Sequence, residues 1–409
     1  MTVETSSLES YQYVNEYSPY GGVPLESTSA DPTAVALLAE LGITDVEQVL
    51  ALAAMADTRD YLAEALRERG TDAGELIARL REEAPAQMAM VEAAAPVGPV
   101  PTGALPPTAE IEAMIASQAM PMSAEFAPAA LPPSVNHIAK MPPIRNQGSR
   151  GTCTAFAMTA VHEFHSKASG SPQDYSEQFL YDRTKAIDGN PAICGSWQVK
   201  AATILNGQGQ CREAVWPYNG FPPCNNNGAI PANAPADAAQ FKLPTIVLQP
   251  KDVNAIKAAL AGGVVVGFSI PCYDSWRLNP STRQTGRITL RLGNEPVNGG
   301  HAMCLVGYQD DASAPGGGFF ILRNSWDVTW GSQCPFGPGH GTIPYAYIAA
   351  DCWEAVTTPK PVMRPRPWDR WRPRDRVIRP IGEGDELAED GGRPTIVIDT
   401  GGVYDIVIR

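Results

Sequence analysis

The most informative stretch of the sequence reads Gln147-Gly148-Ser149-Arg150-Gly151-Thr152-Cys153-Thr154-Ala155-Phe156-Ala157. Its first half is rich in glycine and small polar residues, so the chain can turn tightly there. Apolar residues then continue at helical spacing through Phe164, which predicts a helix that begins at Cys153. A sulfur at a helix N-terminus lies where the helix dipole favours the thiolate.

Two later segments supply the groups that a cysteine nucleophile needs. Gly300-His301 offers an imidazole, and Asn324-Ser325-Trp326 offers a carboxamide. A thiolate needs a base beside it, and the imidazole needs a group that holds its tautomer and orientation. We therefore predict Cys153, His301, Asn324 and Gln147 as catalytic residues. In this scheme the Gln147 amide donates a hydrogen bond to the developing oxyanion.

These motifs resemble those of the papain-like cysteine peptidases. The resemblance rests on Gln-Gly-x-x-Gly-x-Cys-x-Ala-Phe, Gly-His-Ala and Asn-Ser-Trp-x-x-x-Trp-Gly, and it spans residues 131–357. Three further fragments are similar to bacterial members of the family, namely Ser176–Leu180, Trp216–Tyr218 and Ile343–Ile348. The resemblance implies an endopeptidase that hydrolyses peptide or protein substrates through an acyl-enzyme and needs no cofactor or metal.

Three residues depart from the family pattern without removing a catalytic group. Arg150 stands where many members have a disulfide cysteine, so a rearranged bridge is expected. Thr154 replaces the usual aromatic residue after the nucleophile, and Asp327 replaces a common glycine.

The order of elements predicts an α+β fold, with helix first and strands later. The apolar runs expected to form strands are Val264–Ile270, Ile288–Leu292, Ala302–Tyr308 and Phe319–Arg323. The resemblance implies a two-lobed domain at 131–357, with a helical left lobe and a β-rich right lobe, preceded by a small helical bundle.

The chain before this domain divides into three parts. Residues 1–30 are polar, residues 31–83 show helical periodicity, and residues 84–130 form an Ala/Pro/Met-rich linker. Asp31-Pro32 predicts the start of a helix, and Thr44 with Glu47 predicts a capping box. By position, residues 1–130 are a propeptide. The expectation is that the linker, including a helix at Ile111–Met120, lies in the cleft and is cut near Leu131.

The chain after the domain changes composition twice. Residues 358–393 are rich in proline and arginine and then acidic, which predicts an extended linker. Residues 394–409 alternate apolar and polar residues around Thr400-Gly401-Gly402, which predicts a β-hairpin. An isolated hairpin is marginally stable, so it is expected to dock on its own domain or on a protein partner.

Whole-chain properties exclude several function classes. The net charge of −13 predicts no general affinity for nucleic acid. No run reaches the roughly 18 apolar residues of a membrane helix, and the N-terminus lacks a classical signal peptide. His162 and His165 share a helix face, but no further ligands complete a metal site.

All eight cysteines fall between Cys153 and Cys352. We expect Cys304 to be a buried free thiol because it lies in an apolar run. The remaining six are expected to form three disulfide bridges, whose pairing the sequence leaves open: Cys194, Cys211, Cys224, Cys272, Cys334 and Cys352. The richness in cysteine suggests export by a non-classical route, whereas the missing signal peptide suggests the cytoplasm.

Two other functions fit the same sequence. An enzyme with this nucleophile can transfer the acyl group to an amine or trim one dedicated peptide, because both share the acyl-enzyme. The alternative that is not an enzyme is an inactive scaffold, which recruits partners through its helical bundle and C-terminal hairpin.

Overall fold

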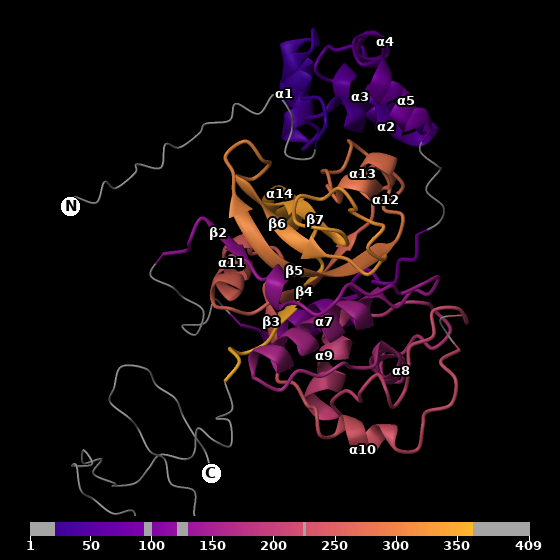
Figure 1. Ribbon diagram of the computed structural model, residues 1–409, viewed down its shortest axis with the longest axis vertical. Helices are drawn as coiled ribbons and strands as arrows, with labels where there is room; N and C mark the ends of the chain where they lie inside the picture. Colours follow the sequence, from indigo (N-terminus) through magenta and orange to yellow (C-terminus); the bar gives the residue numbers. More distant parts are fainter. Residues whose placement is uncertain (1–20, 94–99, 121–129, 224–225, 363–409) are drawn as a thin grey trace, which may run out of the picture. The chain divides into compact units, whose positions relative to one another are not determined.

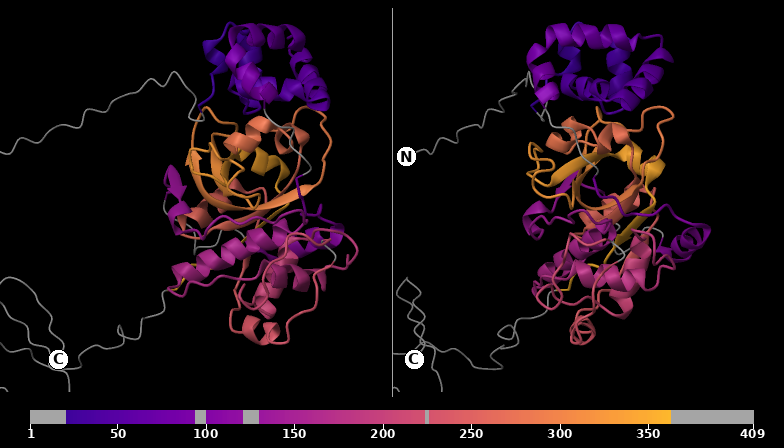
Figure 2. Two further views of the ribbon diagram at one scale, coloured as in Figure 1. Left: turned by 45° about the vertical axis from the view of Figure 1, so that its right-hand side comes forward. Right: turned by 90° about the vertical axis from the view of Figure 1, so that its right-hand side faces the viewer.

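Helix α7 (Cys153–Ala168) runs through the middle of the protein and is buried along most of its length. The computed structural model describes residues 21–93, 100–120, 130–223 and 226–362. Three other helices of the same lobe are α8 (Glu177–Lys185), α9 (Gln198–Gly207) and α10 (Ala234–Ala238). Figures 1 and 2 show these helices gathered on one side of strands β4 and β5. The predicted helix after Cys153 is confirmed.

The second lobe is built on a sheet in the order β1-β3-β8-β4-β5-β6-β7, with β2 also paired to β5. All the pairings are antiparallel except that of β1 with β3. Buried aromatic residues such as Phe268, Tyr308 and Phe320 form the core beside it. The strands are β1 (Ala119–Met120), β2 (Ser134–Asn136), β3 (Ile246–Leu248), β4 (Val266–Pro271), β5 (Gly300–Asp310), β6 (Gly318–Arg323), β7 (His340–Pro344) and β8 (Glu354–Thr357).

Four helices and one 3-10 turn complete this part of the chain. They are η2 (Ile138–Lys140), α11 (Val253–Ala261), α12 (Asp274–Arg277), α13 (Pro280–Thr285) and α14 (Tyr345–Asp351). The α+β prediction is confirmed, and so are the predicted strands now seen as β4, β5 and β6. The predicted strand at Ile288–Leu292 is wrong. That segment forms no strand because Leu290 N donates outside the sheet, to Leu41 O at 2.9 Å.

A helical module precedes the two lobes, and we use this name for residues 21–93. Its helices share one apolar core in which Leu38, Leu50 and Leu62 are buried. They are η1 (Leu25–Ser27), α1 (Pro32–Glu40), α2 (Val46–Ala54), α3 (Ala56–Arg67), α4 (Ala73–Glu83) and α5 (Pro85–Ala93).

The ends of the module's first two helices test the predicted caps. Asp31 caps α1 as predicted, because its side chain accepts hydrogen bonds from Thr33 N and Ala34 N. The predicted capping box of Thr44 with Glu47 is wrong. Gln48 accepts from the backbone N–H groups of Thr44 and Asp45, and Glu47 instead accepts from Val23 N at 3.0 Å.

Between the module and the lobes lies helix α6 (Ala109–Gln118), which packs against α9 and β3. Its buried residues Ile111 and Ile115 join the core of the helical lobe. The predicted C-terminal hairpin at 394–409, and most of the linker at 358–393, lie outside the described residues. Among the helices described, none is long and apolar enough to cross a membrane.

Candidate active site

Cys153, His301 and Asn324 meet where the two lobes face each other. Cys153 opens α7, His301 lies on β5, and Asn324 directly follows β6. His301 Nε2 lies 2.8 Å from Asn324 Oδ1, and Ala302 N donates to Cys153 Sγ at 3.3 Å. The structure thus brings together, from distant parts of the sequence, the thiol, ring and amide that the motifs singled out.

The contacts of Asn324 fix the tautomer of His301. Asn324 Oδ1 also accepts from Ser325 N at 2.7 Å, so this atom is an oxygen and His301 Nε2 must carry the hydrogen. His301 Nδ1 is then the basic nitrogen, and within the described part of the chain it has no hydrogen-bond partner. The ring of Trp326 stacks on the imidazole with centroids 4.2 Å apart. This ring shields the His301–Asn324 hydrogen bond from water.

Burial disfavours charge on both Cys153 and His301. Burial raises the pKa of the Cys153 thiol to about 11, although backbone hydrogen bonds from Ala302 and Thr154 oppose the shift. Burial lowers the pKa of His301 to about 4, against the opposing hydrogen bond with Asn324. Both groups are 0 % exposed, and the charged thiolate–imidazolium pair is therefore disfavoured here.

Gln147 is buried beside the other three residues, and its amide is occupied. Its Nε2 donates to Arg150 O at 2.8 Å and to Pro101 O at 3.3 Å. Its Oε1 accepts from Ser325 Oγ at 2.6 Å. The amide N–H groups expected to serve an oxyanion are thus turned toward two backbone carbonyls.

A short segment, Pro101–Leu105, covers the sulfur, and we call it the plug. Gly103 N and Ala104 N both donate to Gly300 O at 3.0 Å. Gly103 O accepts from Ser196 N at 2.9 Å, and Leu105 N donates to Ser196 O at 3.1 Å, so the plug pairs with Ser196 in the parallel sense. The Ala104 side chain, 3 % exposed, joins Cys153 and Ala302 in one apolar cluster.

The plug fits only because its central residue has no side chain. A Cβ atom at Gly103 would lie 2.1 Å from Gly151 O, which real Cβ atoms do not approach. Facing glycines are equally confined, since a Cβ atom at Gly195 would lie 2.5 Å from Gly103 O. The linker, to which Pro101–Leu105 belongs, was expected in the cleft together with a helix at Ile111–Met120, but the sequence did not single out the plug. Helix α6 in that range packs on α9 and β3 instead.

Each of the three departures from the family motif has a definite environment. The Arg150 guanidinium is buried and donates to Gln178 Oε1 at 2.8 Å, at the position where many members of the family have a disulfide cysteine. Thr154 Oγ1 reaches Gly103 O at 3.4 Å and thus touches the plug. Asp327 has a positive φ of 71°, which the glycine it replaces would adopt without strain.

The cysteine prediction is partly wrong. Cys304 is a buried free thiol, as expected, but four of the six cysteines assigned to bridges are also free: Cys211, Cys272, Cys334 and Cys352. Three bridges among the six therefore cannot form. From these six only Cys194 and Cys224 are left as a candidate pair, and Cys224 lies outside the described residues.

The two neighbouring histidines of α7 have separate partners. His162 Nδ1 lies 3.0 Å from Gln210 Oε1, and His165 Nδ1 lies 3.1 Å from Thr358 Oγ1. Over the ranges that the structure describes, no three His, Cys, Asp or Glu side chains are grouped to hold a metal ion.

A buried charged cluster lies next to the site, between α7 and strands β5 and β6. Arg145, Glu163, Glu177 and Arg323 line a cavity there together with Asn324. Burial raises the pKa of Glu163 to about 7, against the opposing hydrogen bond from Tyr175 N and the charge of Arg145. This cluster joins residues of both lobes.

Comparison with known proteins agrees with this geometry. The model of the papain family cysteine proteases matches residues 131–337, about half of the chain. The protein is a member of the papain family of cysteine proteases. The predicted resemblance and the enzyme class, a papain-like cysteine protease, are thereby confirmed.

The chain is similar to proteins from widely different sources. A peptidase C1-like protein of Acanthamoeba polyphaga mimivirus is 25 % identical over 52 % of this chain and 70 % of its own length. Cathepsin J of Rattus norvegicus is 28 % identical over 46 % of this chain, which spans 54 % of cathepsin J. Among solved structures, xylellain, a cysteine protease from Xylella fastidiosa, is 27 % identical with a TM-score of 0.53, over 64 % of this chain and 96 % of xylellain.

Proposed function

We propose that this protein is a cysteine endopeptidase that uses Cys153, His301, Asn324 and Gln147, and that the chain described here is its zymogen. The observation that carries the proposal is the contact of the plug with the sulfur. Ala104 and Ala302 pack around Cys153, which is 0 % exposed. Ala302 N donates to Cys153 Sγ at 3.3 Å, and the preceding residue, His301, is held by Asn324 at 2.8 Å.

The reaction follows from the tautomer of His301. With the plug removed, Nδ1 takes the thiol proton, and the thiolate attacks the carbonyl carbon of the substrate peptide bond. The oxyanion that forms accepts hydrogen bonds from Cys153 N and from Gln147 Nε2, whose present acceptor Pro101 O leaves with the plug. The imidazolium gives its proton to the leaving amine as the C–N bond breaks. Water then attacks the thioester with His301 as base, which frees the acid and the thiol.

Blocking without cleavage follows from the direction of the plug. It pairs with Ser196 as a parallel neighbour, and the backbone N–H groups of Gly103 and Ala104 both donate to Gly300 O. The plug carbonyl to which Gln147 Nε2 donates is that of Pro101, at 3.3 Å. We infer that a plug running in this direction blocks the site without being cleaved.

The proposal is tested by comparing the wild-type chain with Cys153→Ala under reducing conditions. We expect the wild type to shorten itself, then to hydrolyse peptides and to take up an epoxide probe at Cys153. The Cys153→Ala variant should do none of these three things. In the shortened enzyme, His301→Ala should lower kcat/KM by roughly 100- to 10,000-fold. Absence of probe at Cys153 after residues 1–130 have been removed would overturn the assignment.

A further inference from the structure

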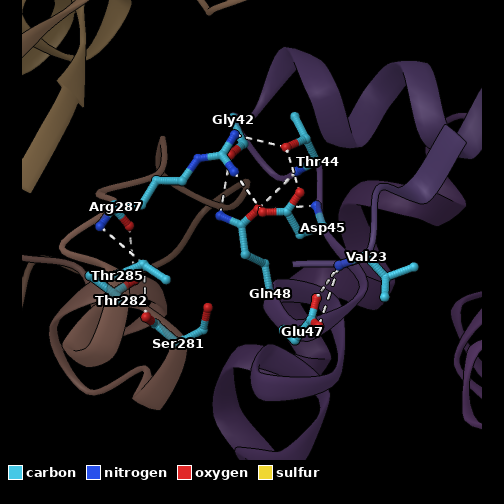
Figure 3. Close-up of polar contacts among 10 residues, drawn as sticks. All are labelled: Val23, Gly42, Thr44, Asp45, Glu47, Gln48, Ser281, Thr282, Thr285 and Arg287. Atoms are coloured by element: carbon cyan, nitrogen blue, oxygen red, sulfur yellow. Dashed lines mark hydrogen bonds and ion pairs between the residues drawn. The ribbon is translucent and has the colours of Figure 1, made fainter. Parts of the chain in front are cut away.

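The helical module contacts the sheet lobe through α2, which packs on α13, and through the segment that follows α13. One surface of this contact is defined by side-chain interactions. On the lobe side this surface is Arg287–Leu292, which follows α13, and on the module side it is the loop Leu41–Asp45. Arg287 Nη1 lies 2.9 Å from Asp45 Oδ2, and Arg287 Nη2 donates to Thr44 Oγ1 at 2.8 Å (Figure 3). Side-chain exposure is 17 % for Arg287 and 6 % for Asp45, so the ion pair is largely shielded from solvent.

Both sides of this contact are held in place by their own domains. Thr282 Oγ1 donates to Arg287 O at 3.0 Å, and Ile288 N donates to Thr342 O, so α13 and β7 fix the backbone that carries the guanidinium. On the module side, Gln48 accepts from both Thr44 N and Asp45 N (Figure 3). Groups positioned in advance lose little freedom on docking, which is the property of a built interface.

Apolar packing completes the surface. Leu292 of the lobe is 0 % exposed and belongs to the apolar core of the module rather than to that of the sheet. Leu290 N donates to Leu41 O beside it. Gly42, with φ of +79°, brings the module loop close to Thr289 and Pro344. The segment read from sequence as a strand is thus occupied in docking the module.

The plug itself is a weak element that lies between two anchored ones. It buries one small apolar side chain, Ala104, and is held by a few hydrogen bonds, from backbone groups and from side chains such as those of Gln147 and Trp326. After the plug, α6 is anchored on the helical lobe by Ile111 and Ile115. Before it, residues 94–99 lead back to α5, the last helix of the module. A short tether from a docked domain gives an effective concentration on the order of millimolar, which is lost when the domain detaches.

We propose that Arg287–Leu292 is the docking surface for the helical module, and that the Arg287–Asp45 ion pair is the latch that keeps the plug over Cys153. This inference rests on the proposed function, because it concerns the regulation of the same site. The module inhibits from a distance: it touches the lobe at α13 and at this surface, and it precedes the plug in the chain. Replacing one partner of a shielded ion pair removes its attraction for the other, so the closed state is weakened without any change at the catalytic residues.

The test measures how fast an epoxide probe labels Cys153 in the freshly purified, uncleaved chain, scored by intact mass. Arg287→Glu and Asp45→Arg should each raise the labelling rate at least tenfold. The charge swap, Asp45→Arg with Arg287→Asp, should return the rate to within about threefold of wild type, since a pair is restored. Arg283→Glu, the same charge change at an exposed residue of α13 in the same sequence region, should leave the rate unchanged.

A second arm separates failure of the latch from failure of the proposed function. Gly103→Val disturbs the plug directly and leaves the docking surface intact. If Gly103→Val raises labelling but Arg287→Glu and Asp45→Arg do not, the latch is wrong and the plug stands. If Gly103→Val does not raise labelling, the proposed zymogen is wrong and the latch falls with it. Should Arg287→Glu unfold the chain, Asp45→Asn serves as the decisive variant. We expect it to raise the labelling rate of Cys153 at least threefold, and an unchanged rate would overturn the latch.

Discussion

The plug and the helical module are both N-terminal to the catalytic lobes, yet they are built in opposite ways. The plug covers the sulfur with backbone atoms and one alanine, and every close approach in it depends on glycine. The module has a buried core of its own and contacts the enzyme at α13 and Arg287–Leu292, which hold none of the four proposed catalytic residues. Blocking and holding are thus divided between two regions, so each can be disrupted without the other.

The largest effect is expected where the plug has no spare room. Gly103→Val places side-chain atoms against Gly151 O, where even a Cβ atom would lie at 2.1 Å, so the plug cannot seat. We expect the probe-labelling rate of the full-length chain to rise at least 100-fold. Gly207→Val, at a position with no heavy atom within 4 Å of an added Cβ, is the matched control. Equal rates for the two variants would mean that the plug does not limit access to Cys153.

A smaller effect is expected from loosening the core of the module. Leu50 is 1 % exposed, and Leu50→Ala should destabilise the module by about 2–5 kcal/mol through lost burial and a cavity. We expect an earlier thermal unfolding transition for the module and faster labelling of Cys153. Arg59→Ala, which truncates a half-exposed side chain of the same module, should change neither. A destabilised module with an unchanged labelling rate would show that the plug stays over Cys153 without help from the module.

Acid is expected to weaken the plug through His301. In the plugged state its pKa is lowered to about 4, below the ordinary value of 6.5, so the neutral ring is retained on burial. The open state binds a proton first as pH falls, and the plugged state therefore loses stability between about pH 6.5 and 4, by about 3 kcal/mol in total.

Hydrogen exchange at the Gly103 and Ala104 amides, corrected for intrinsic rates, measures this opening. In Cys153→Ala, which cannot cleave itself, protection should fall across that pH range. The double variant Cys153→Ala, His301→Gln has no ring to titrate and should lack the slope. An identical slope in both proteins would assign the acid sensitivity to another group.

The sequence was sufficient where local pattern and local structure coincide. The helix at Cys153 follows from a glycine-rich turn before an apolar run, and the first helix of the module follows from Asp31-Pro32. Cys153, His301 and Asn324 could be singled out because each stands in its own short motif, although only the fold brings them together.

Sequence was insufficient where a segment's partner lies far away in the chain. Ile288–Leu292 has the composition of a strand, but Leu292 is buried in the core of the module and Leu290 bonds to Leu41. The plug differs in no local way from the rest of its Ala/Pro-rich linker, since what defines it is the space beside Gly151. The prediction of three disulfide bridges failed for the same reason, because the spacing of cysteines along the chain does not show which of them lie close together in the fold.

The smallest expected effect concerns a group that belongs to neither region. Glu163 is 5 % exposed on α7, and burial raises its pKa to about 7. An acid whose pKa is higher in the folded state is protonated there first, so stability is greatest at low pH and falls as pH rises from about 4.5 to 7. Glu163→Gln keeps an acceptor for Tyr175 N and removes this dependence. The melting temperature should therefore rise by about 1–4 °C at pH 8 relative to wild type and change little at pH 4.5.

Because Glu163 touches neither plug nor docking surface, its variant should label at the wild-type rate. A faster rate would show that the charged cluster next to the site also controls opening, and the division between plug and module would then be incomplete.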